Sequence, residues 1–142
     1  MKRLQWWMRI VGGFYVLLGL GFVPFINEAR LPFMIPAFAA TPDTVEFKAL
    51  IDWMFTFGLD LLVTGGVLVY AARDPLRHSI LVQLLIALEV VRGVLDDIYY
   101  VSRGYAPAGF YVGFVAVHLI IIVTGVVLLR QATAEARRLE TA

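Results

Sequence analysis

Four apolar stretches, each close to the length of a membrane-spanning helix, dominate this 142-residue sequence. They lie at about 4–26, 47–72, 78–101 and 108–129, and the connectors between them carry charged residues. A helix needs roughly 20 apolar residues to cross about 30 Å of hydrocarbon, and 61% of this chain is hydrophobic while only 16% is charged. The pattern predicts an all-α fold, an integral membrane four-helix bundle forming a single domain, with a short cytoplasmic tail at 130–142.

The composition excludes several classes of function. The chain has no cysteine, which excludes disulfides, thiolate metal sites and cysteine nucleophiles. Its formal net charge of +1 gives no field that would attract a polyanion, so we expect no nucleic-acid partner. The connectors are too short to hold a separate soluble catalytic domain. Any chemistry must therefore take place inside the bundle or at its ends.

The distribution of basic residues predicts the orientation. Most lysines and arginines fall near the two termini and in the connector at 73–77, whereas few fall on the opposite side. Basic residues next to membrane helices favour the cytoplasmic side. We therefore expect a multi-pass protein of the cytoplasmic membrane with both termini in the cytoplasm.

The segment at 27–46 is expected to lie outside the regular spans. Pro32, Pro36 and Pro42 interrupt it, and proline prevents a long continuous helix. Its remaining apolar residues favour a loop that folds back onto the bundle or into the membrane interface. The segment is a candidate lid on the outer side.

Ionisable side chains within the apolar stretches are the candidate site residues. Each costs about 2.5–3.5 kcal/mol at the centre of a membrane helix, so such groups usually face the bundle interior. A rise of 1.5 Å per residue places Asp60, Glu89 and His118 near one depth. The full set, a predicted ligand or polar network, is Asp52, Asp60, Glu89, Arg92, Asp96 and His118.

Helical spacing predicts how these groups pair. Spacings of three and four residues place Glu89, Arg92 and Asp96 on one helical face. We expect Arg92 to pair with Glu89 and with Asp60 or Asp96, and neutral His118 to donate to a remaining carboxylate. Because carboxylates outnumber cations here, we expect at least one acid to be protonated at neutral pH.

Several functions fit this pattern. The favoured one is a non-enzymatic membrane protein with an outward-open polar and aromatic pocket for a small amphiphilic or apolar molecule. An intramembrane isomerase or cyclase that uses Asp60 or Glu89 on a lipid-like substrate is the enzymatic alternative. An accessory subunit of a larger complex or a homo-oligomer is a third, and a network that only fixes helix register is a fourth. No metal and no cofactor are expected.

Three segments resemble a known family. They are MRIVGGFYVLLGLGF, IDWMFTFGLDLLVTGG followed by ARDP, and the third stretch with Glu89, Arg92 and Asp96 before YY and RGY. Together they resemble the BphX-like family of small bacterial four-span membrane proteins and, more distantly, the DoxX-like group. The resemblance implies a four-helix bundle in the bacterial inner membrane, sometimes encoded near aromatic-degradation genes. It implies no settled activity.

Overall fold

The computed structural model describes residues 1–105 and 108–140, which form helices and turns without any strand. This confirms the predicted all-α class. The predicted connector residues 106 and 107 and tail residues 141 and 142 lie outside the described part. The elements in chain order are α1 (Lys2–Leu20), α2 (Pro24–Met34), α3 (Val45–Ala71), α4 (Ser79–Glu89), the π-helix η1 (Val90–Leu95), α5 (Asp96–Arg103) and α6 (Ala108–Glu140).

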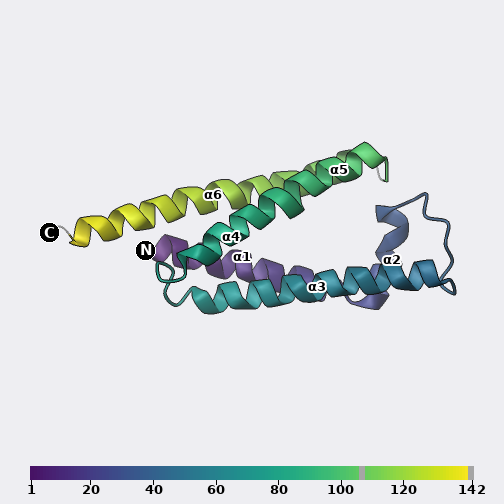
Figure 1. Ribbon diagram of the computed structural model, residues 1–142, viewed down its shortest axis with the longest axis horizontal. Coiled ribbons are helices and arrows are strands. Elements are labelled where there is room, and N and C mark those ends of the chain that lie inside the picture. Colours follow the sequence, from purple (N-terminus) through teal and green to yellow (C-terminus); the bar gives the residue numbers. More distant parts are fainter. Residues whose placement is uncertain (106–107, 141–142) are drawn as a thin grey trace.

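The helices form two long pairs. In one pair α1 packs along α3, and in the other the consecutive elements α4, η1 and α5 run beside α6 (Figure 1). Both chain ends lie at the same end of the molecule (Figure 1). The main apolar core joins the two pairs, and Leu4, Met8, Val82 and Leu85 are among its largest fully buried side chains.

Glycines allow the backbones of α1 and α3 to approach closely. A Cβ added to Gly65 would lie 2.5 Å from the carbonyl oxygen of Gly12, and one added to Gly19 would lie 2.6 Å from that of Gly58. Small residues at such contacts are typical of helices that associate within lipid. By contrast, Gly109 and Gly113 on α6, which have the same four-residue spacing, have no atom within 4 Å of an added Cβ.

The first apolar stretch does not continue as one helix to residue 26. α1 ends at Leu20, and α2 begins at Pro24 with its axis bent by 91° from that of α1. Proline suits the first position of a helix because its missing N–H has no partner there in any case. The expected loop at 27–46 is therefore helical as far as Met34, which corrects the prediction for that part.

The segment after the bend folds back against α3. Leu31 of α2 is almost completely buried and packs in a small apolar cluster with Phe47 and Ile51 of α3. Pro32, in the last turn of α2, removes one backbone donor, and the helix ends two residues later. This second cluster holds α2 over the end of α3 that is remote from the chain termini.

Two helices are long and apolar enough to cross a membrane. They are α3 and the part of α6 that spans Ala108–Leu139, and the bent pair α1 and α2 adds a third if it counts as one broken span. The third apolar stretch is helical from Ser79 to Arg103, but η1 interrupts its α-helical pattern. α6 also continues without a break through the predicted tail as far as Glu140.

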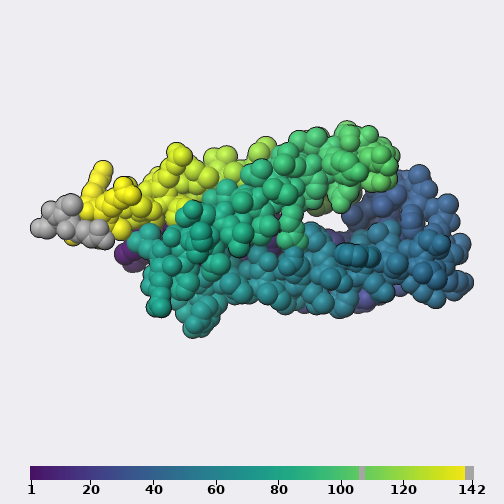
Figure 2. Space-filling model, in the orientation of Figure 1, coloured from purple at the N-terminus to yellow at the C-terminus, as the bar shows by residue number. Residues whose placement is uncertain are grey.

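The two helix pairs diverge at the end remote from the termini. There α5 packs on α6 and η1, whereas α2 packs on α3. Figure 2 shows a hollow between them, bounded by the green surface of α5 on one side and the blue surfaces of α2 and α3 on the other. This hollow, called the outer hollow below, is the largest separation between the pairs visible on that face.

Candidate functional site

A completely buried carboxylate joins three helices. Glu89, the last residue of α4, is 1% exposed. The hydroxyl of Tyr15 on α1 donates a hydrogen bond to Glu89 Oε1. On the other side, Nδ1 of His118 on α6 lies 2.5 Å from Glu89 Oε2. Both oxygens of the carboxylate are therefore engaged, as a buried charged or polar group requires.

The local backbone makes room for this cluster. η1 begins directly after Glu89 and contains Gly93, and a Cβ added to Gly93 would overlap the imidazole ring of His118. Only glycine therefore allows α6 to bring His118 so close to η1. π-Helical turns occur frequently at functional sites.

An ion pair connects the two helix pairs through η1 and α3. Nη2 of Arg92 on η1 lies 2.5 Å from Oδ2 of Asp60 on α3. The Arg92 guanidinium also lies 4.9 Å from the centre of the Phe57 ring, a cation–π contact. The Asp60 side chain is 55% exposed and that of Arg92 is 32% exposed. Unlike Glu89, this pair is accessible.

The predicted polar network is thus divided into two contact groups. Arg92 pairs with Asp60, and His118 pairs with Glu89, whereas no ion pair joins Arg92 to Glu89 among the described residues. The wider turn of η1, with i to i+5 hydrogen bonds, changes the angle between residues 89 and 92. Of the expected pairs, Arg92 forms the one with Asp60 and His118 the one with a remaining carboxylate, Glu89.

The other two predicted residues lie beside these groups. Asp96 is half-buried at the start of α5, and its Oδ1 accepts a hydrogen bond of 2.8 Å from the Asp97 backbone N–H. Its charge interacts electrostatically with both His118 and Arg92. Asp52 is exposed on α3, two turns from Asp60, and its backbone carbonyl accepts a hydrogen bond from the Thr56 hydroxyl. The structure does not bring Asp52 into either group.

Two residues of this site, Tyr15 and Gly93, are not among the residues predicted from the sequence. Tyr15 is one of them, because the sequence alone does not show whether a tyrosine on a helix makes an apolar contact or a hydrogen bond. Gly93 resembles any other helical glycine in the sequence. A hydroxyl-bearing residue on the helix that packs against a buried acid is the signal that would indicate Tyr15. The spacing of one turn between Glu89 and Gly93 is the signal that would indicate Gly93.

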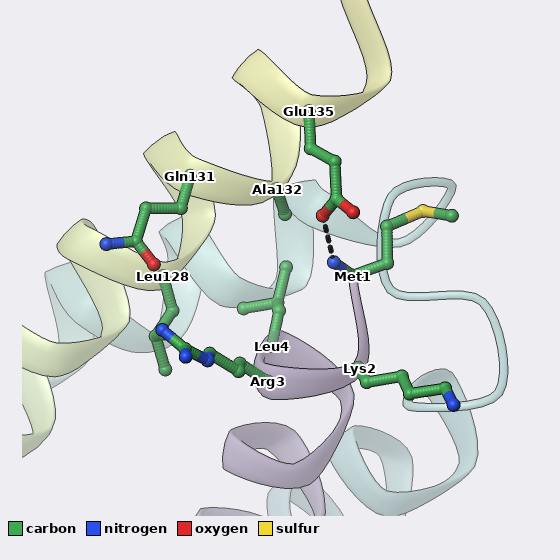
Figure 3. Close-up of a pocket in the computed structure, with 8 residues that line it drawn as sticks. All are labelled: Met1, Lys2, Arg3, Leu4, Leu128, Gln131, Ala132 and Glu135. Carbon is green, nitrogen blue, oxygen red and sulfur yellow. Dashed lines mark hydrogen bonds and ion pairs between the residues drawn. The ribbon is translucent and has the colours of Figure 1, made fainter. Parts of the chain in front are cut away.

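A separate depression lies at the end that holds the chain termini. Leu4, Leu128 and Ala132 line its floor, and the Met1 amino group forms an ion pair of 2.5 Å with Glu135 (Figure 3). The depression is shallow and remote from the buried acid.

Among the residues that the structure describes, no cluster of three His, Asp or Glu could hold a metal ion.

The fold and these contacts first define a class: a small all-helical protein with helices able to cross a membrane and a buried acid among them. The family model of BphX-like proteins matches residues 1–134. The chain therefore belongs to the BphX-like family, which confirms that part of the resemblance seen in its sequence.

Two curated relatives share this family. An uncharacterized BphX-like protein of Burkholderia cepacia is 31% identical over 96 residues, which cover 68% of this chain and 69% of the relative. An uncharacterized BphX-like protein of Paraburkholderia xenovorans strain LB400 matches with the same identity and coverage. No solved structure matches the chain at a significant level.

Proposed function

We propose that this chain is a non-enzymatic protein of the bacterial inner membrane that binds a small amphiphilic molecule in its outer hollow. In this account α1 with its bend, α3, the run from α4 to α5, and α6 are four spans, with both termini in the cytoplasm. The basic residues near the termini support that orientation. The outer hollow then opens away from the cytoplasm.

The single observation that carries the proposal is the accessible ion pair in the middle of an apolar helix. Asp60 lies in the central part of α3, which is apolar enough to cross a membrane, yet its side chain is 55% exposed. Charged groups at that depth face a bundle interior or a water-filled cavity and not lipid. The Asp60–Arg92 pair therefore supports a polar hollow between the two helix pairs.

Aromatic rings provide the apolar part of the hollow. Phe57, one turn from Asp60, is 37% exposed, and its ring meets that of Phe22 edge-to-face with centroids 5.3 Å apart. Binding sites for small molecules combine such apolar walls with a few placed polar groups. A molecule with a polar head and an apolar tail suits this combination.

Acid catalysis is less well supported by the same contacts. The Glu89 carboxylate is fully enclosed, and both of its oxygens are engaged by Tyr15 and His118. Asp60 is paired with Arg92. Glu89 is closed to a substrate, and Asp60 is held in an ion pair with Arg92, so we favour binding over an isomerase or cyclase reaction.

Photolabelling tests the proposal directly. The protein is placed in phosphatidylcholine nanodiscs with a photoreactive dodecanol that carries a diazirine on its tail, and the labelled peptides are mapped by mass spectrometry. We expect labels to concentrate around Phe57 and Arg92, and excess dodecanol to remove them. Labels spread evenly over the outer faces of α3 and α6, or unchanged by dodecanol, would overturn the proposal.

A further inference from the structure

An arginine at the bend between α1 and α2 is held rigidly without a carboxylate partner. Nη2 of Arg30 donates a hydrogen bond of 2.5 Å to Oδ1 of Asn27. Asn27 is completely buried, and its own amide group donates to the carbonyl oxygen of Phe22 at 2.7 Å. The Arg30 guanidinium lies 3.7 Å from the centre of the Phe22 ring. These contacts fix the orientation of the guanidinium.

One donor of this guanidinium is left unused. The Nε–H of Arg30 is buried and has no hydrogen-bond partner among the described residues. A buried donor without a partner costs about 1–3 kcal/mol. No acidic side chain in the described part of the chain forms an ion pair with Arg30, in contrast to Arg92 with Asp60. An oxyanion that reaches Nε when the side chain shifts toward the hollow would supply the missing partner.

Arg30 is connected to the outer hollow through aromatic contacts. Its guanidinium covers Phe22, the Phe22 ring meets Phe57, and Phe57 lies beneath Arg92. α2, which carries Arg30, forms one boundary of the hollow in Figure 2. Asp60 forms an ion pair with Arg92, whereas no carboxylate among the described residues forms one with Arg30.

We propose that Arg30 binds the carboxylate head of a single-chain amphiphile whose tail lies on the Phe22 and Phe57 rings. The inference rests on the proposed function and names the class of molecule that the outer hollow takes. A guanidinium presents two parallel N–H donors that match the two oxygens of a carboxylate. A single cation also suits a monoanion better than a doubly charged phosphate. Because the side chain is already ordered, little conformational entropy is lost on binding.

The test compares amphiphiles that share one tail. Dodecanoate, dodecanol, dodecylamine and dodecyl phosphate each compete with the photoreactive dodecanol in phosphatidylcholine nanodiscs, at a mildly alkaline pH at which the carboxylic acid is ionised. We expect dodecanoate to compete at about tenfold lower concentration than dodecanol, the ratio that one charge-assisted contact provides. Dodecylamine is expected to compete least well.

Variants assign the preference to Arg30. In Arg30→Gln the advantage of dodecanoate over dodecanol should disappear, while competition by dodecanol itself remains. Arg30→Lys retains the charge but not the paired donors and should recover only part of the advantage. Arg103→Gln, which removes an exposed arginine at the end of α5, should retain all of it. Dodecanol competition in each variant shows that the hollow is folded.

The outcomes separate the two proposals. If dodecanol competes but dodecanoate has no advantage, or if the advantage survives in Arg30→Gln, the inference about Arg30 is wrong and the proposed function stands. Stronger competition by dodecyl phosphate than by dodecanoate would overturn the carboxylate class. If no amphiphile competes, the proposed function fails first, and the inference fails with it.

Discussion

His118 on α6 and Glu89 on α4 meet with Nδ1 and Oε2 2.5 Å apart, in a place where the glutamate is shielded from solvent on all sides. The hydroxyl of Tyr15 completes the cluster from α1. The three side chains thus join the two helix pairs through one carboxylate.

Removal of the charge on Glu89 is expected to destabilise the fold. In Glu89→Gln the amide oxygen still accepts from Tyr15, but His118 faces the amide NH2 and loses the charge-assisted contact that the carboxylate provides. We expect the free energy of unfolding to fall by about 1–3 kcal/mol, measured by reversible unfolding in mixed detergent micelles. The matched control is Glu46→Gln, on an exposed glutamate in the first turn of α3, which should change it by less than about 0.5 kcal/mol. Equal effects of the two substitutions would contradict the role of the cluster.

Gly93 should tolerate no side chain while His118 is present. Gly93→Ala forces the imidazole away from Glu89, and overpacking of this kind costs about 1–3 kcal/mol. In a His118→Ala background the same substitution should cost much less, because the ring is no longer there. Gly113→Ala, where an added Cβ meets no atom within 4 Å, is the control on α6. Additive effects of Gly93→Ala and His118→Ala would show that the two residues do not compete for space.

Adjacent glycines on α3 offer a matched test of the α1–α3 contact. Gly65→Ala places a Cβ 2.5 Å from the Gly12 carbonyl oxygen and should separate the helices, with a loss of about 1–3 kcal/mol. Gly66→Ala meets open space and should leave stability unchanged or raise it slightly. Thermal unfolding of both variants measures the difference. A Gly65→Ala protein as stable as Gly66→Ala would contradict the close packing.

The strength of the Asp60–Arg92 coupling reports on the polarity of the outer hollow. A double-mutant cycle with Asp60→Asn and Arg92→Gln should give a coupling energy of about 0.2–1 kcal/mol, the range for solvent-accessible pairs. A dry pair would behave differently, since breaking a buried pair costs about 3–5 kcal/mol. A coupling in that higher range would mean that water does not enter the hollow.

Part of this architecture is predictable from the sequence, because apolar length and helical rise are local properties. Those properties indicate the helices and the common depth of Asp60, Glu89 and His118. Which of these charged residues pair with each other is not predictable in the same way. η1 changes the helical phase between Glu89 and Arg92, and its sequence VVRGVL does not indicate a π-helix. The bend at residues 21–23 and the position of Arg30 depend on how α2 packs against α3, which is a tertiary contact.

Cysteine accessibility at two positions on α3 tests the central claim that the outer hollow is open to water from the outside. The chain has no cysteine, so Phe57→Cys and Leu59→Cys each introduce a single thiol at nearly the same depth. Phe57 lies against Arg92 in the hollow, whereas Leu59 is 46% exposed on another face of α3. With a membrane-impermeant maleimide added to intact cells, the account predicts rapid labelling of Phe57→Cys and little labelling of Leu59→Cys. Labelling of neither position, or equal labelling of both, would contradict it.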